Sequence, residues 1–567
     1  MVAAYECMRM GLHPVVVEAS GRVGGRLFST PVEGVPFERG AMRFPVSGKA
    51  LMHYMEKVGM RANSEDFPNP GSPAAVSTVV DYKGATYYFE GDDGPFPRPE
   101  KFREIEERFF NEFLEQAPIR FSEMEQAMSA GAENTDLIKV IWNNLLALGW
   151  DNMSFSAAMV EQARWSSEDI NLFGQIGFGT GGWNTDFPNG FLEVLRVLYT
   201  GLDVNHQLMR DGADQLPERL WSTPARSFGD EQHYWPDDVT VQALSRSAQG
   251  KHDPLYQEVS LITRQGEQFE VHLRDLQTQQ TYTAVYKAVI YTPHVRILDK
   301  FRYAVPGWPA GQSLLSQQQW EAVMYTHYMQ SAKLFAATHS PFWKARGSDG
   351  KQLMSITLSD RITRGTYLVD YANSTGPYQG SGIFLSYTWN DDSLKLQGER
   401  PQMPNTQLCT ALLDQVYPGL DLASHYIQGD PFATIHWENE PFYLGAFKMN
   451  LPGQYEYQRQ LFSQFHDGGN GVQGDGFVLA GDDVSWTAGW AEGAVTTALN
   501  AVDKLAMKFN NGTAPATGPI SQWARLKPIA LSGLAPAEVG GALCRLIGRL
   551  MSRLCREPRR GSVPPNR

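Results

Sequence analysis

A short apolar run that ends on an acid and leads into a glycine-rich turn constrains the fold of this chain most. Residues 15–17 are three valines, the composition of a buried strand, and Glu18 follows them directly. An acid at the tip of the second strand of a nucleotide-binding unit accepts hydrogen bonds from ribose hydroxyls. Gly24 and Gly25 would let backbone N–H groups approach a pyrophosphate, and Arg26 adds a positive charge. The run therefore predicts a dinucleotide-binding α/β unit.

The spacing of these residues resembles the hallmark of the flavin amine oxidase superfamily, E-x-x-x-R-x-G-G-R, with Arg22 as its first arginine. For the acid alone, a strand followed by a charged surface turn would be the simpler interpretation, but the whole spaced set favours the family. The resemblance implies a Rossmann-like FAD-binding domain with an inserted α+β substrate domain. The residues that it places at FAD are Glu18, Ala19, Gly24, Gly25 and Arg26.

A second arginine follows in the run Gly40-Ala41-Met42-Arg43, where a planar guanidinium could meet a ligand carboxylate with two hydrogen bonds. This run resembles the branch of the superfamily that oxidises free L-amino acids, the L-amino acid oxidases and tryptophan 2-monooxygenases. The resemblance places all four residues beside FAD and assigns the substrate carboxylate to Arg43.

The N-terminus departs from the family pattern. In a dinucleotide-binding unit, a first strand and a G-x-G-x-x-G loop precede a helix and then the second strand. Residues 2–11 have the pattern of that helix, so the first strand and its loop are expected to be missing from this chain. Without the loop, the helix N-terminus has no cradle for a pyrophosphate. This departure motivates one alternative, a flavin-free and inactive fragment.

The hydrophobic periodicity changes twice in the middle of the chain. Residues 47–220 are mostly helical in pattern, and the resemblance implies that such an insertion roofs the substrate cavity. Strand patterns return at 239–241, 259–263 and 269–273, which are expected to form a meander, and the stretch 282–291 follows it. The family places a valine backbone against the adenine side of FAD in this region, with Val241 as the nearest candidate.

Two polar residues lie in apolar strand patterns. Lys333, within 331–335, is unusual because burying an ammonium is costly, and an edge-strand lysine that snorkels to water is the alternative. The resemblance implies that Lys333 holds a water against flavin N5. It also implies that Tyr387, within 383–389, helps to hold the substrate carboxylate, with a core tyrosine as the alternative.

Aromatic residues near the C-terminal motif are candidates for the walls of a substrate site. On composition alone, Phe447, Trp490 and Trp437 could all belong to the core. By resemblance, Phe447 and Trp490 hold the substrate above the flavin, and Trp437 is a weaker candidate. This aromatic set favours an aromatic amino acid as substrate.

The closing motif is a buried strand pattern at 477–480 that leads into glycine and acid, followed by a helix expected to reach about Met507. A helix N-terminus presents free N–H groups and a positive dipole. By resemblance it meets the pyrimidine edge of the isoalloxazine, while the acid binds ribityl or phosphate-side hydroxyls. The residues assigned to FAD here are Gly481, Asp482, Gly489, Trp490, Glu492, Gly493 and Ala494.

The motifs divide the chain into an FAD-binding domain of residues 1–45, 236–300 and 465–508, and a substrate domain of residues 46–235 and 301–464. Residues 509–567 form a C-terminal tail with apolar residues at helical spacing among arginines. A nonconforming appendage is favoured over a membrane-surface helix, because one short basic helix binds membranes weakly.

Charge and cysteine content limit the partners. A formal net charge of -13 argues against nucleic acid, whose phosphates would be repelled. Four cysteines without metal-ligand spacing predict no metal site and fit a reducing cytoplasm. No apolar run is long enough to span a bilayer. The oligomeric state stays open, with a homodimer as one option.

The combined prediction is FAD-dependent oxidation of an L-amino acid at Cα by molecular oxygen. The products are a 2-oxo acid, ammonia and hydrogen peroxide, or an amide if oxidative decarboxylation follows, and the sequence does not separate the two. A monoamine or polyamine oxidase is the alternative within enzymes, and it would require Arg43 to serve the structure instead of a substrate carboxylate.

Overall fold

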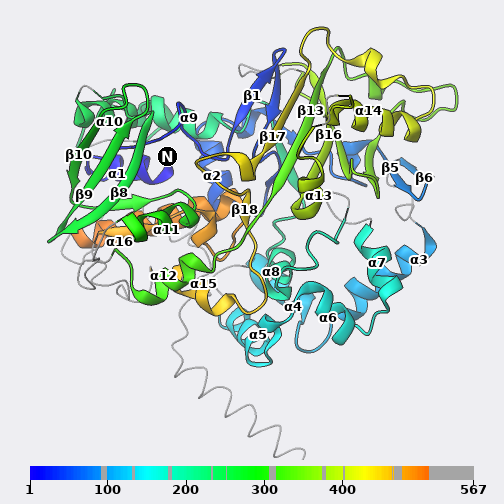
Figure 1. The fold of residues 1–567 in the computed structure, drawn as a ribbon, viewed down its shortest axis with the longest axis horizontal. Coiled ribbons are helices and arrows are strands. Elements are labelled where there is room, and N and C mark those ends of the chain that lie inside the picture. Colours follow the sequence, from blue (N-terminus) through cyan, green and yellow to red (C-terminus); the bar gives the residue numbers. More distant parts are fainter. Residues whose placement is uncertain are drawn as a thin grey trace, which may run out of the picture.

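The computed structural model describes residues 1–90, 99–130, 135–175, 182–230, 234–250, 252–304, 314–372, 374, 379–399, 402–462, 464 and 476–509. These residues form a mixed α/β fold whose three parts lie side by side in Figure 1. One part carries the first and last helices, the second is built on the largest sheet, and the third is helical. All of the predicted C-terminal tail except Phe509 lies outside the described residues.

The two outer sequence motifs meet in the first part. Helix α1 (Val2–Arg9) packs against α16 (Ala491–Phe509), and β19 (Phe477–Leu479) pairs in parallel with β11 (Val289–Tyr291). The predicted meander is confirmed in part, because its segments 259–263 and 269–273 lie in an antiparallel sheet of the order β10-β9-β8. The strands of this sheet are β8 (Gln257–Gln265), β9 (Gln268–Asp275) and β10 (Thr281–Tyr286). The other helices of the first part are α2 (Lys49–Lys57), α9 (Gln215–Ser222), α10 (Val241–Gln249), α11 (Val295–Ala304), α12 (Gln317–Met324) and α15 (Tyr455–Phe462).

Seven strands form the largest sheet of the described residues, in the order β17-β13-β16-β15-β14-β5-β6. They are β5 (Ser77–Tyr82), β6 (Ala85–Glu90), β13 (Ser331–Thr338), β14 (Ile356–Ser359), β15 (Gly365–Asp370), β16 (Ser381–Trp389) and β17 (Phe432–His436). Helices α13 (Asn390–Lys395) and α14 (Asn405–Val416) lie in the chain between β16 and β17. Phe37 stacks on Phe335 of this sheet with ring centroids 5.2 Å apart. The hairpin of β1 (Ser29–Val32) and β2 (Val35–Glu38) thereby joins its core.

The helical part contains α3 (Glu100–Glu107), a π-helical turn (Arg108–Phe113), α4 (Phe121–Ala130), α5 (Thr135–Ala147), α6 (Phe155–Glu161), α7 (Ser167–Gln175) and α8 (Phe191–Thr200). Buried aromatic residues such as Phe109, Trp142 and Phe155 fill its core. Small ladders connect the parts: β3 (Phe44–Pro45) and β4 (Ser64–Asp66) pair with β7 (His206–Met209), and β12 (Tyr328–Met329) pairs with β18 (Phe447–Lys448).

Two secondary-structure predictions were wrong. Residues 15–17 form no regular strand, because Val16 donates its N–H to Ser245 Oγ at 3.0 Å instead of joining a ladder. Residues 239–241 enter helix α10, which Thr240 caps by accepting from Ala243 N–H. The segment 47–220 is mostly helical, as predicted, and it also supplies strands β4 to β7, because β5 pairs with β14 from far along the chain and this pairing overrides local periodicity.

Candidate active site

A cavity of about 1690 Å³ is lined by residues from all three parts of the fold. Typical small-molecule sites measure about 300–1,000 Å³, so this one has room for a dinucleotide together with a small substrate. Most of the predicted site residues line it: Glu18, Ala19, Gly24, Gly25, Arg26, Gly40, Ala41, Met42, Arg43, Lys333, Tyr387, Trp437, Phe447, Gly481, Asp482, Gly489, Trp490 and Ala494.

The glycines of the first motif shape one wall of this cavity. Gly24 and Gly25 have φ values of +109° and +60°, which disfavour a side chain, and a Cβ on Gly25 would meet nothing within 4 Å. The segment 40–43 packs on the same turn, with Ala41 N–H donating to the Arg26 carbonyl at 3.1 Å. This bare backbone beside open space fits a pyrophosphate.

Gly40 is the tightest contact of the site, since a Cβ there would lie 1.7 Å from the Arg26 carbonyl oxygen. We expect Gly40→Ala to force the two segments apart, with a loss of about 1–3 kcal/mol in folding stability and weaker flavin retention. The thermal midpoint and the flavin-to-protein ratio measure both effects.

Gly347→Ala is the control for this variant, because its nearest neighbour is the flexible carboxylate of Asp349 at 3.1 Å. We expect a change within about 0.5 kcal/mol there, as for ordinary surface substitutions. Equal effects of the two variants would contradict the close packing at Gly40.

Glu18 lies at the end of the cavity where the adenosine side is expected. Its Oε1 accepts from the N–H and the hydroxyl of Ser20 at 2.7 and 2.8 Å, and burial raises its pKa. Gln257 N–H donates to the Glu18 carbonyl at 2.8 Å, which brings Val259 of β8 to the cavity wall. Val241 is instead fully buried in α10 and does not line the cavity, so the prediction that it contacts the adenine side of FAD is wrong. Val259 lines the cavity in its place, and the strand pattern at 259–263 was the sequence signal for it.

Arg26 and Asp482 join the two outer motifs. They form a close ion pair, Arg26 also donates to the Ala446 carbonyl at 2.7 Å, and Asp482 accepts from Gly489 N–H at 3.2 Å. Burial alone would raise the pKa of Asp482, but the Arg26 charge reverses this and holds it below its ordinary value. The pair therefore fixes the glycine turn to the entry of α16.

His294 is a cavity residue that sequence reasoning missed. Its Nδ1 donates to the Tyr443 carbonyl at 2.9 Å, while its buried Nε2 has no hydrogen-bond partner among the described residues. Burial, with Arg26 second, lowers its pKa to about 3, so the ring is neutral and Nε2 is an unused acceptor. An unpaired buried acceptor on a residue that lines the cavity fits a cofactor that carries hydroxyl or imide donors.

Arg43 and Lys333 are the two cations of the predicted substrate end. Arg43 is 9% exposed, and its nearest carboxylate, Asp203, lies 3.7 Å from Nη1. Lys333 donates to the carbonyls of Glu38, at 3.0 Å, and of Gly40, and burial lowers its pKa. Its strand β13 pairs on both sides, with β16 and β17, so the alternative of a snorkelling edge-strand lysine is wrong.

Aromatic side chains line the predicted substrate end of the cavity. Lys333 Nζ lies 4.8 Å from the ring centroid of Tyr387, its cross-strand partner. Trp490 stacks on His206 with centroids 5.6 Å apart, and Trp437 is anchored by donating Nε1–H to the Arg39 carbonyl at 3.0 Å.

Trp389 completes this enclosure, although sequence reasoning missed it. Its ring meets Tyr387 and Phe447 edge-to-face at 5.9 and 5.7 Å. Because Trp389 follows Tyr387 by two residues in β16, strand alternation places both on one face, and this was the available signal.

Two residues assigned to FAD lie away from the lining. Glu492 accepts from the N–H groups of Ala50 and Leu51 at 3.1 and 2.7 Å and so caps helix α2. Gly493 packs tightly on the preceding loop, since a Cβ there would lie 2.6 Å from the Thr487 carbonyl. Neither side-chain position faces the cavity, and both hold the entry of α16 in place.

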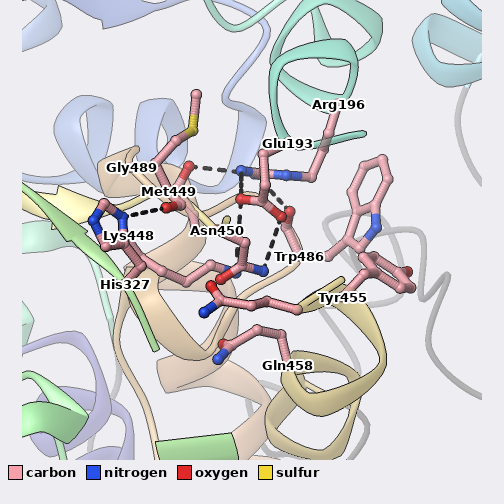
Figure 2. Close-up of polar contacts among 12 residues, drawn as sticks. Glu193, Arg196, His327, Lys448, Met449, Asn450, Tyr455, Gln458, Trp486 and Gly489 are labelled. Atoms are coloured by element: carbon pink, nitrogen blue, oxygen red, sulfur yellow. Dashed lines mark hydrogen bonds and ion pairs between the residues drawn. The ribbon is translucent and has the colours of Figure 1, made fainter. Parts of the chain in front are cut away.

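A buried polar network supports the loop that leads to Trp490 (Figure 2). Arg196 of α8 donates to Glu193 at 2.9 Å and to the carbonyls of Trp486 and Ala488 at 2.7 and 3.3 Å. Asn450 donates to the other Glu193 oxygen at 3.1 Å. The network ties the helical part to the α16 entry.

Lys448 adds a second cation to this network, 4.0 Å from Glu193. It lies in β18 directly after Phe447, so the same cluster also anchors the strand that carries a predicted substrate wall. His327 fixes the next residue by donating Nδ1–H to the Met449 carbonyl at 2.8 Å (Figure 2).

The described part of the chain shows neither a metal-ligand cluster nor a membrane-spanning helix. No group of three or more His, Cys, Asp or Glu side chains there could hold a metal ion. No helix among those residues is long and apolar enough to cross a membrane.

Comparisons with known proteins agree with this geometry. A family model described as flavin containing amine oxidoreductase matches residues 1–506. Tryptophan 2-monooxygenase of Pseudomonas savastanoi is 30% identical, covering 88% of this chain and 86% of its own. L-amino-acid oxidase of Siganus canaliculatus is 23% identical, covering 89% and 83%. Wild-type putrescine oxidase bound to putrescine shares the fold, with a TM-score of 0.60 and 16% identity over 88% of this chain and 95% of that one. This chain therefore belongs to the flavin containing amine oxidoreductases, a family whose cofactor is FAD.

Proposed function

We propose that this enzyme oxidises an L-amino acid at Cα. The observation that carries the proposal is the buried Arg43 guanidinium in the wall of a cavity that Tyr387, Phe447 and Trp490 also line. A buried arginine presents a planar fork that matches a carboxylate, and an amine substrate would offer it nothing. The printed names of two relatives, tryptophan 2-monooxygenase and L-amino-acid oxidase, support the same substrate class.

The residues of this chain would divide the work of binding and orientation. FAD, when bound, supplies the acceptor for the hydride that leaves Cα. Arg43 and Tyr387 would hold the α-carboxylate, and Phe447 and Trp490 would hold the rest of the substrate beside the flavin. Gly24, Gly25 and the entry of α16 bind the cofactor. Lys333, buried and fixed by two carbonyls, holds a water and its proton near the reacting centre.

Two sets of products are compatible with oxidation of the substrate at Cα. If the imino acid is released, water hydrolyses it to a 2-oxo acid and ammonia, and oxygen is reduced to hydrogen peroxide. If it is retained, the substrate loses CO₂ and takes up one oxygen atom as an amide, while the other oxygen atom leaves as water. The difference lies in how long the cavity holds the first product.

Product analysis on a panel of L-amino acids and their decarboxylated amines tests the proposal. We expect flavin absorbance in the purified protein, bleaching by amino acids without oxygen, and no bleaching by the amines. Peroxide with a 2-oxo acid identifies an oxidase, and an amide with CO₂ identifies a monooxygenase. Turnover of amines alone would instead support a monoamine or polyamine oxidase, and protein that never takes up FAD would support the inactive fragment.

A further inference from the structure

Two carboxyl groups in the cavity are not used by the proposed chemistry. Asp186, just before α8, is 7% exposed, and Asp203 follows the same helix. Both line the cavity, and so do Val194, Val197 and Leu198 of the intervening helix. The wall formed around α8 thus combines apolar surface with two acids.

Asp186 has little to compensate its charge. Its Oδ1 accepts from Asn189 Nδ2 at 3.3 Å, and among the described residues its Oδ2 has no hydrogen-bond partner and the carboxylate has no ion pair. Burial, with Asp203 adding repulsion, raises the pKa of Asp186 to about 7. At 7% exposure the side chain is largely shielded from water, and no cation lies beside it among the described residues, so a bound cation or donor would stabilise the site.

Asp203 is placed differently. It lies 3.7 Å from Arg43 Nη1, and its buried Oδ1 has no hydrogen-bond partner in the described structure. His206, at 4.0 Å, does not neutralise it, because burial and Arg43 lower the pKa of this histidine to about 3. Asp203 therefore belongs to the carboxylate-binding end with Arg43, and Asp186 remains as the acid without a cation.

We propose that Asp186 binds the side-chain cation of a basic L-amino acid such as L-lysine. This inference rests on the proposed function. Arg43 would hold the α-carboxylate, the apolar residues of α8 would cover the methylene stem, and the terminal ammonium would reach Asp186. Trp389 and Trp490 also line the cavity, and their ring faces can attract a cation. An aromatic substrate would leave Asp186 buried and unpaired.

The test compares L-lysine with L-norleucine, which keeps the same four-carbon chain and lacks the ammonium. We expect the wild-type holoenzyme to favour L-lysine by about a hundredfold in kcat/KM, as for a buried charge pair. In Asp186→Asn we expect the lysine-to-norleucine ratio to fall by about a hundredfold, and in Asp186→Glu to be partly retained. L-Tryptophan is the third substrate, and it should be turned over more slowly than L-lysine.

Asp151→Asn is the matched control, since this acid also has a pKa raised to about 7 by burial but lies outside the cavity lining. Its lysine-to-norleucine ratio should stay unchanged. A wild-type preference for L-norleucine or L-tryptophan, or an unchanged ratio in Asp186→Asn, would overturn this inference alone. Turnover of decarboxylated amines without any amino acid would overturn the proposed function with it. The flavin content and thermal midpoint of each variant show whether a loss of activity reflects misfolding. If Asp186→Asn misfolds, the preference of the wild-type enzyme among L-lysine, L-norleucine and L-tryptophan tests the inference.

Discussion

Arg43→Ala is expected to lower kcat/KM for L-amino acids by roughly a hundredfold or more, mainly through KM. Removing one partner of a buried, hydrogen-bonded charge pair costs about 2–5 kcal/mol, and each 1.4 kcal/mol is a factor of about ten. The loss should fall on KM because the carboxylate is bound equally in the ground state and the transition state. Steady-state kinetics at saturating oxygen measure the split between KM and kcat.

Two comparisons separate carboxylate binding from a structural role of Arg43. Arg43→Lys keeps the charge but loses the planar fork, so its activity should lie between those of the wild type and Arg43→Ala. Any residual activity on decarboxylated amines should be unaffected by either substitution, because these substrates have no carboxylate to lose. An equal loss on amines and amino acids would show that Arg43 acts only by holding the cavity together, for instance through Asp203.

The outer motifs could be predicted because their chemistry is local. Gly24, Gly25 and Arg26 are adjacent in sequence, and their conformations and charge follow from residue type. Lys333 was also predictable, since a lysine in an apolar strand needs a reason to be buried. The fold class followed from these motifs, and the family comparison confirms it. The domain boundaries remain predictions.

The predictions that were wrong or missing concern residues whose structure depends on contacts between distant segments of the chain. Val241 was placed in a strand because a β-branched run of three residues fits both a strand and a helix start, and Thr240 decides for the helix. Asp186 and His294 carry no local signal, because their importance comes from burial and from partners that they lack. A single sequence without a structure does not show which acids or histidines are left unpaired.

The Glu193–Arg196 pair is the other place where a single substitution should have a large effect. Both side chains are nearly fully buried, at 5% and 2% exposure, and Arg196→Met would leave the Glu193 carboxylate with only Asn450 and the more distant Lys448. Breaking a buried ion pair by removing one partner costs about 3–5 kcal/mol. We expect a clear fall in the thermal midpoint, measured by circular dichroism.

Arg120→Met is the matched control for this substitution. Arg120 also pairs with a glutamate three residues away, Glu123, but these side chains are 37% and 45% exposed. Exposed pairs contribute about 0–1 kcal/mol, so the thermal midpoint should hardly change. Similar losses in Arg196→Met and Arg120→Met would mean that burial does not set the strength of the pair.

The activity of Arg196→Met should fall together with its stability, because the Arg196 guanidinium of the wild type holds the carbonyls of Trp486 and Ala488 just before Trp490. Releasing them frees the α16 entry, so KM for the amino acid should rise and flavin should dissociate more readily. In the double variant Glu193→Gln with Arg196→Met, the stranded carboxylate is gone and part of the stability should return, although Lys448 then loses its nearest carboxylate. The carbonyls of the loop stay unpaired in that variant, so its KM should stay high. Recovery of stability without recovery of KM would separate the cost of the buried charge from the positioning of Trp490, and joint recovery would show that the loop needs no arginine.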